Sequence, residues 1–153
     1  MDTLAGAGLH RLAVCSPYPE LLAAGEARGF LPLCNRNGAE GIAASIRLGL
    51  SAMADLDGVL FAVCDQPFLT TKSIINLVNS FQESKTAICA LAWKGQRGNP
   101  AVFPRDLFGE LAALIGDVGG GEVIARHRDR LVLVEAASPR ELADVDYPAD
   151  LTE

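Results

Sequence analysis

The stretch GVLFAVCDQPF, residues 58–68, decides the predicted fold. Its first part, GVLFAVC, carries no charged or hydroxyl side chain, which is typical of a strand in a parallel sheet that is covered on both faces. Pro67 cannot donate a hydrogen bond to a neighbouring strand, so the strand has to stop before it. The strand therefore delivers Asp65 to the carboxyl edge of a sheet, where open α/β sheets bind their ligands.

Apolar runs and helical patterns alternate on both sides of this strand. Short strands are expected at 12–15, 30–33, 86–93, 101–103 and 131–134. Helices are expected from Pro17 to Gly29, and at 40–53, 70–81, 104–114 and up to about 127. This alternation predicts an α/β fold with a Rossmann-like, doubly wound, mostly parallel sheet. Residues 1–153 are expected to form a single domain, since no linker or repeat interrupts them.

Charge and composition exclude several classes of protein. The net charge is −6, and the 13 Lys and Arg residues form no basic stripe, so nucleic acid is not an expected partner. No apolar run approaches the about 20 residues that cross a bilayer. Since Met1 to Thr3 is also not the start of a signal peptide, we expect a cytoplasmic protein without membrane contact. The 4 cysteines are widely spaced, which favours buried free thiols over disulfides or zinc.

Asp65 is the residue whose position points most directly to chemistry. A carboxylate at the end of a buried strand is costly to bury alone, and it suits a Mg²⁺ ion that carries phosphates. An alternative stays open, in which Asp65 only caps the helix that follows.

Several segments, taken together, resemble the MobA-like nucleotidyltransferase family, and most of all the molybdenum cofactor cytidylyltransferases. They are EGIAASIRLGL at 40–50, CDQPFLT at 64–70, GQRGNPAVF at 95–103, GDVGGGEVI at 116–124 and DVDYPADL at 144–151. The resemblance runs from about Leu12 to Leu151. It implies transfer of a nucleotide from CTP, or GTP, to the terminal phosphate of molybdopterin, with Mg²⁺ as cofactor and pyrophosphate as product. It also implies a molybdoenzyme as the partner that receives the cofactor.

The resemblance further implies roles for single residues. Asp65 and Asp146 would bind Mg²⁺, with Asp65 as the catalytic residue. The nucleotide would contact Asn35, Glu40, Gly41 and Ser45. The phosphorylated acceptor would contact Arg97, Gly98, Asn99, Pro100, Asp117, Gly119 and Gly120. Arg47, just past the matched stretch, is expected to be a solvated helix residue. Structural alternatives stay open for every segment: a capped helix at 40–50, a hairpin turn at 94–100, turn glycines at 116–121 and a turn at 144–148.

One departure from the family is large. Its members begin with a strand and a glycine-rich loop of the form LAAGxSxRMGxxK, which holds the triphosphate through backbone amides and cationic side chains. The nearest stretch here, LLAAGEARGF at 21–30, sits in a helical pattern and is expected to be an ordinary helix. The family's N-terminal strand is therefore expected to be missing, which would leave neighbouring strands with unpaired edges. This leaves two alternatives open, a non-catalytic molybdopterin-binding protein and transfer to another phosphorylated acceptor, such as a sugar phosphate.

Overall fold

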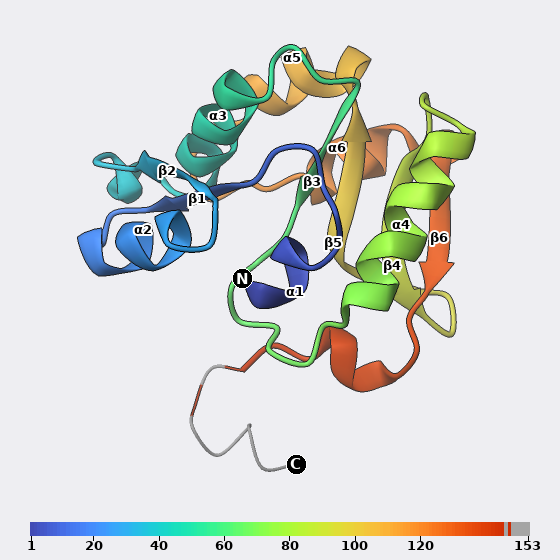
Figure 1. The fold of residues 1–153 in the computed structure, drawn as a ribbon. Coiled ribbons are helices and arrows are strands. Elements are labelled where there is room, and N and C mark those ends of the chain that lie inside the picture. The colour runs from blue at the N-terminus through green and yellow to red at the C-terminus, as the bar shows by residue number, and fades with distance from the viewer. Residues whose placement is uncertain (146, 148–153) are drawn as a thin grey trace.

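The computed structural model describes residues 1–145 and 147, whose strands form two sheets (Figure 1). The smaller sheet pairs β1 (Ala13–Ser16) in parallel with β2 (Leu31–Cys34). The larger sheet has the strand order β3 (Gly58–Phe61), β5 (Gln96–Pro104), β4 (Ile88–Trp93) and β6 (Leu131–Glu135). β4 and β6 are parallel, whereas β5 runs antiparallel to both of its neighbours.

Helices alternate with these strands along the chain. The α-helices are α1 (Asp2–Ala5), α2 (Pro19–Glu26), α3 (Ile42–Ala52), α4 (Thr71–Glu83), α5 (Phe108–Ala112) and α6 (Gly121–Arg126). Short 3-10 turns are formed by Gly38–Glu40, Arg105–Leu107, Arg128–Arg130 and Pro139–Leu142. None of the helices in the described part of the chain is long and apolar enough to span a membrane.

The four-stranded sheet is covered on both faces. Cys89 and Val102 pack against Leu77 and Phe81 of α4. The alternate residues of β4 and β5 point to the other face, where they join a larger core with α3, α5 and α6. A strand covered on both faces needs apolar residues at every position, which is why β4 reads ICALAW. Helices therefore cover both sides of the sheet, as the alternating pattern predicts.

β1 and β3 belong to different sheets and share no backbone hydrogen-bond ladder. Each has only one strand partner among the described strands, so each keeps one open edge. β2 and β6 likewise have one partner each, so all four are edge strands of the described sheets. The N-terminal segment lies close by and is tied to α4, since the Thr71 hydroxyl donates to the Thr3 carbonyl at 3.1 Å. Leu4, Ala7 and Leu9 pack against the core under α4.

The segment LLAAGEARGF forms α2 and the turn that ends it, as predicted. The turn places Gly29 at φ 81°, a conformation that favours glycine. Gly25 packs against β1 so closely that a Cβ there would lie 2.4 Å from a methyl carbon of Val14. This glycine serves helix packing, so the stretch is not a phosphate-binding loop.

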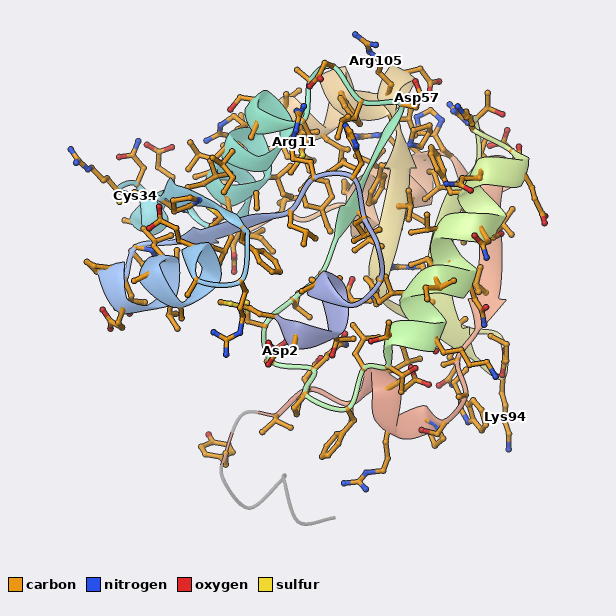
Figure 2. The ribbon with its side chains drawn as sticks, in the orientation of Figure 1. Asp2, Arg11, Cys34, Asp57, Lys94 and Arg105 are labelled. Carbon is orange, nitrogen blue, oxygen red and sulfur yellow. The ribbon has the colours of Figure 1, made fainter. Side chains whose placement is uncertain are left out.

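Two predicted strands have different bounds in the structure. β3 ends at Phe61 although the apolar run continues to Cys64. Phe61 pairs with Ala101, and in this antiparallel pair residue 62 would face Pro100, which has no backbone N–H to donate. β5 begins at Gln96, so residues 96–100 are not part of a glycine-rich turn as predicted. The turn is confined to Lys94 and Gly95, both at positive φ (Figure 2).

The start of the next helix also differs from the prediction. Pro104 is the last residue of β5 and does not open a helix. The chain passes through the Arg105–Leu107 turn before α5 begins at Phe108. Pro104 itself is fully buried, which is compatible with a strand end against the core.

The prediction of buried thiols is confirmed for Cys89, while Cys15 is only half-buried and the other two cysteines contradict it. All of them are free, but Cys34 and Cys64 are exposed (Figure 2). Cys34 is the last residue of β2 and Cys64 follows β3, where the chain leaves the sheet and side chains are no longer covered. Cys89, in the centre of the large sheet, is buried as predicted, and this burial raises the pKa of its thiol.

Candidate functional site

The predicted nucleotide-binding residues lie where β2 ends and α3 begins. Asn35 is buried, its Nδ2 donates to the Ser45 hydroxyl at 2.9 Å, and its Oδ1 accepts from the Asn37 backbone N–H at 3.0 Å. Asn35 therefore uses both ends of its amide to hold the loop against α3. Ser45 is half-buried, so of these two side chains it is the more accessible to a ligand.

Glu40 is paired with Arg47, a contact that the sequence does not reveal. Arg47 Nη2 lies 3.1 Å from Glu40 Oε2, and Arg47 Nη1 donates to the backbone carbonyl of Leu114 at 2.8 Å. The prediction that Arg47 is only a solvated helix residue is therefore wrong. Its guanidinium joins the turn before α3 to the loop after α5.

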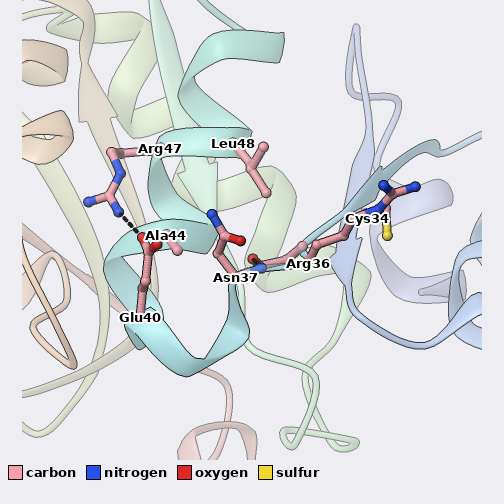
Figure 3. Close-up of a pocket in the computed structure, with 8 residues that line it drawn as sticks. Cys34, Arg36, Asn37, Glu40, Ala44, Arg47 and Leu48 are labelled. Carbon is pink, nitrogen blue, oxygen red and sulfur yellow. Dashed lines mark hydrogen bonds and ion pairs between the residues drawn. The ribbon is translucent and has the colours of Figure 1, made fainter.

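Two hollows adjoin this ion pair. The first, of about 430 Å³, is lined by Cys34, Asn35, Arg36, Asn37, Glu40, Ala44, Arg47 and Leu48 (Figure 3). The second, of about 360 Å³, is lined by Ala39, Glu40, Gly41, Arg47, Ile115, Gly116 and Asp117. Both volumes lie within the range of small-molecule sites. Glu40 and Arg47 line both hollows, so the ion pair stands between them.

At Gly41 the turn before α3 is in direct backbone contact with the turn at Gly116. Gly41 has φ 78°, and a Cβ at this position would lie 2.5 Å from the carbonyl carbon and oxygen of Gly116. Ala43 N donates to the Gly116 carbonyl at 3.2 Å, and Ile42 N donates to Asp117 Oδ1 at 3.4 Å. Segments predicted to bind different substrates, around Gly41 and around Asp117, are therefore packed directly against each other.

Arg97 lies beside the glycines that precede and begin α6. A Cβ at Gly121 would be 3.4 Å from Arg97 Nη2, which places the guanidinium over the first residue of the helix. Gly120 packs on the Phe103 ring, where a Cβ would come within 2.6 Å of Cζ. Gly119 lies near Ile42, at the start of α3. The fold thus brings Arg97 next to the glycines at 119–121, and their acceptor role stays a prediction.

The other predicted acceptor residues form an irregularity in β5. The register with β4 passes from Ala101 opposite Ala90 to Arg97 opposite Ala92, so Gly98, Asn99 and Pro100 face a single residue. This is a bulge, a feature common next to active sites. Asn99 is exposed, whereas Pro100 is fully buried and shapes the bulge from inside. A Cβ on Gly98 would lie 2.9 Å from Leu142, so the bulge meets the C-terminal turn.

Asp65 is exposed and held by the C-terminal segment. Val145 N donates to the Asp65 carbonyl at 2.8 Å. Gln66 Nε2 donates to Asp144 Oδ1 at 3.0 Å, and it lies 3.4 Å from the Leu142 carbonyl. The segment CDQP and residues 142–145, far apart in the sequence, therefore lie side by side.

The carboxylates of these segments fit Mg²⁺ in their chemistry. Mg²⁺ is usually bound by one or two carboxylates and completes its shell with water and phosphate oxygens. Asp65 and Asp144 are exposed carboxylates on adjoining segments, and the Gln66 amide orients one of them. Asp146, predicted as the second metal residue, lies outside the described residues. Among residues 1–145 and 147 no group of three or more potential metal ligands occurs.

The contacts above link into one continuous rim. It runs from Glu40 and Gly41 to the Gly116–Asp117 turn, through the glycines before α6 to Arg97, and along the β5 bulge. From Gly98 it continues through Leu142 to the segment that carries Asp65. Residues assigned from separate segments of the sequence are therefore linked by a chain of contacts.

A buried carboxylate that sequence reasoning missed supports the Asp65 end of this rim. Glu141 is 1% exposed, and its Oε2 accepts from the Thr70 backbone N–H and hydroxyl at 3.1 and 2.9 Å. Its Oε1 accepts from Ala137 N at 2.8 Å. The stretch Ser138-Pro-Arg-Glu141 has the spacing of a capping box, but the Ser138 side chain makes no cap hydrogen bond, so no local pattern reveals this carboxylate.

The fold and this rim define a class: a doubly wound α/β domain that brings carboxylates, an arginine and glycine loops together. The chain belongs to the MobA-like NTP transferase domain family, whose model matches residues 1–131. It is thus a member of a nucleotidyltransferase family, as the resemblance of its motifs predicts. No curated protein matches the chain at a significant level.

Solved structures share this fold. A nucleotidyl transferase from Methanothermobacter has a TM-score of 0.81 and 21% identity, covering 99% of this chain and 74% of that one. Rv0371c from Mycobacterium tuberculosis has a TM-score of 0.77 and 24% identity, covering 99% of this chain and 78% of that one. Its manganese complex has a TM-score of 0.75 and 24% identity, with 99% and 80% covered.

A third similar protein is CMP:2-keto-3-deoxy-manno-octonic acid synthetase, in complex with CTP. It has a TM-score of 0.68 and 14% identity, covering 99% of this chain and 83% of that one. At these identities the similarity shows the fold alone. It confirms the predicted Rossmann-like α/β class.

Proposed function

We propose that this protein transfers the nucleotide of a nucleoside triphosphate, CTP before GTP, to the terminal phosphate of molybdopterin and releases pyrophosphate. Membership of the nucleotidyltransferase family supports the reaction class. The observation that carries the proposal for this chain is the continuous rim from the Glu40–Arg47 hollows to Asp65. The preference for CTP and molybdopterin is supported by the resemblance of the five motif segments to cytidylyltransferases.

The two ends of the rim suit two substrates. The hollow lined by Asn35, Ala44 and Leu48 is large enough for a nucleoside and offers polar and apolar walls. Arg97 stands at the other part of the rim, where a guanidinium can bind a phosphate through two parallel hydrogen bonds. Gly119, with no atom closer than 3.9 Å to a Cβ position, leaves the backbone there open to close approach.

The chemistry requires positioning more than a protein nucleophile. An oxygen of the acceptor phosphate forms a bond to the α-phosphorus, and the bond from that phosphorus to the pyrophosphate oxygen breaks. The attacking oxygen is already anionic, so no general base is needed, and the main task is to align and neutralise charged groups. Asp65, with Asp144 or Asp146, would hold Mg²⁺, which supplies neutralisation of phosphate charge when bound. The manganese in one similar structure and the CTP in another are compatible with this assignment.

Exchanging Asp65 for asparagine is expected to weaken Mg²⁺-dependent CTP binding about 100-fold, because loss of a residue that binds or supports a metal lowers metal affinity by up to about this factor. Isothermal titration with CTP and with GTP, each with and without Mg²⁺, measures this effect. Asp129→Asn is the matched control, because Asp129 is an exposed carboxylate in the turn before β6, away from the rim. It should bind CTP like the unchanged protein.

Titration with molybdopterin, together with an assay for the nucleotide adduct, separates the competing functions. A folded protein that binds molybdopterin but neither nucleotide would be a non-catalytic binding protein, and the transferase proposal would be wrong. Formation of a nucleotide adduct with a sugar phosphate but not with molybdopterin would move the proposal to another acceptor. Under the proposed function the protein acts in the cytoplasm and passes its product to a molybdoenzyme.

A further inference from the structure

The contact between Glu40, Arg47 and Leu114 differs from an ordinary surface ion pair. Exposed pairs contribute little to stability, and Arg47 and Glu40 are 37% and 55% exposed at their side chains. Arg47, however, also donates to the Leu114 carbonyl at 2.8 Å, so its guanidinium binds two loops at once. It acts as a bridge between the turn before α3 and the loop that leads to Asp117.

The loops that Arg47 joins have little freedom to move separately. Gly41 and Gly116 are in close backbone approach, and both have positive φ, at 78° and 70°. The Ala43 amide donates to the Gly116 carbonyl at 3.2 Å. These contacts hold the two turns together at Gly41 and Gly116, whereas Arg47 joins Glu40 to the Leu114 carbonyl at the beginning of the second loop.

Each of the two loops faces a different part of the proposed site. The Glu40 turn lines the hollow assigned to the nucleotide, and the 114–117 loop leads to the glycines beside Arg97. Arg47 itself lines both hollows. A ligand that shifts Glu40 moves one of the two groups that Arg47 binds. The position of the guanidinium, and with it the hydrogen bond to the Leu114 carbonyl, then changes as well.

We propose that Arg47 is a positioning residue that couples the nucleotide hollow to the acceptor loop. Binding of nucleotide at the 35–48 hollow orders residues 113–118 through Glu40, Arg47 and the Leu114 carbonyl, and prepares the acceptor side of the rim. This inference rests on the proposed function, since it takes the 35–48 hollow as the nucleotide site. Arg47 needs no contact with the reacting phosphates for this role.

Hydrogen–deuterium exchange of the full chain, with and without CTP and Mg²⁺, tests the coupling in three variants. Arg47→Met removes both hydrogen bonds but keeps the apolar stem, and Arg47→Lys keeps one positive charge without the fork. Arg11→Met is the matched control, because Arg11 also joins a carboxylate, that of Asp55, to a backbone carbonyl, that of Ala52 at 2.9 Å. Its side chain is similarly half-exposed, at 33%, and contacts the C-terminal end of α3, at the opposite end of the helix from Glu40 and Gly41 (Figure 2 labels Arg11).

Without ligand, peptides at 38–44 and 113–118 should exchange about 10-fold faster in Arg47→Met, the factor expected for a lost charge-assisted hydrogen bond. Arg11→Met should leave both unchanged. With CTP and Mg²⁺, the unchanged protein should be protected at both segments. Arg47→Met should keep protection at 35–45 and lose it at 113–118, with an intermediate result for Arg47→Lys. A purely structural role would not separate the two segments in this way.

The outcomes against the coupling are distinct from those against the function. If CTP protects 35–45 and 113–118 equally in the unchanged protein and in Arg47→Met, the coupling is wrong while the nucleotide site stands. If CTP protects 35–45 alone in the unchanged protein, the coupling is likewise wrong. If CTP and GTP protect neither segment of the unchanged protein, the proposed nucleotide site fails, and the coupling falls with it.

Discussion

Replacing Glu141 by alanine is expected to lower the free energy of unfolding by about 3 kcal/mol or more, because each buried donor left without a partner costs about 1 to 3 kcal/mol. Glu141 is 1% exposed and accepts from the Thr70 N–H, the Thr70 hydroxyl and the Ala137 N–H. Alanine would leave these donors without their partner in a region closed to water. Small domains are stable by only about 5 to 15 kcal/mol, so the loss is a large part of the total.

Urea denaturation measures this loss directly. Glu20→Ala is the control, since Glu20 is an exposed glutamate in the first turn of α2 and has no comparable set of donors. It should change the free energy of unfolding by less than about 0.5 kcal/mol. Equal effects of the two substitutions would show that Glu141 does not hold the start of α4 to the C-terminal turn.

The stabilising contribution of Glu141 is expected to disappear in acid. Burial raises the pKa of its carboxyl. Hydrogen bonds from Ser73, Thr70 and Ala137 lower the pKa by more than burial raises it, so the net pKa is below the ordinary value. Since the folded pKa is below the unfolded one, the contribution is complete above the unfolded pKa and is lost as pH falls through the folded pKa. Urea titrations of the unchanged protein and Glu141→Gln, run from pH 7 downward, should therefore show a stability difference that shrinks in acid. A difference constant with pH would contradict the carboxylate's role.

The sequence predicts the elements whose signal is local. β4 and α4 are found because burial on both faces and a 3.6-residue apolar period are visible in short windows. The bulge at Gly98–Pro100 is not, because glycine, asparagine and proline occur in turns as well as in bulges. Only pairing with β4 distinguishes the two, and that pairing depends on the whole sheet.

The candidate site follows the same division. Asp65, Arg97 and the glycines of 116–121 can be proposed from motifs because each lies in a compact segment. The partners of Arg47 and Glu141 cannot, because Leu114 and Thr70 are separated from them by 67 and 71 positions. These contacts form only when distant loops come together in the folded chain. The sequence identifies the single motifs, and the structure shows which of them are in contact.

Gly41→Ala is expected to lower the free energy of unfolding by about 3 kcal/mol and to weaken nucleotide binding. Gly41 has φ 78° and ψ −171°, a region that is essentially restricted to glycine and costs other residues about 1 to 3 kcal/mol. The added Cβ would also lie 2.5 Å from the carbonyl carbon and oxygen of Gly116. Backbone atoms cannot rotate away as a side chain can, so the turns around Gly41 and Gly116 would have to separate.

Gly38→Ala, in the same turn, separates this effect from the general cost of replacing a glycine. No atom lies within 4 Å of a Cβ at Gly38, and its φ is not positive. Alanine there restricts mainly the unfolded chain, so the stability should stay the same or rise by about 0.4 to 1 kcal/mol. Thermal unfolding and CTP titration of the two variants side by side measure the contrast. If they behave alike, the contact between Gly41 and Gly116 does not hold the two loops together, and the continuous rim around the site loses its first link.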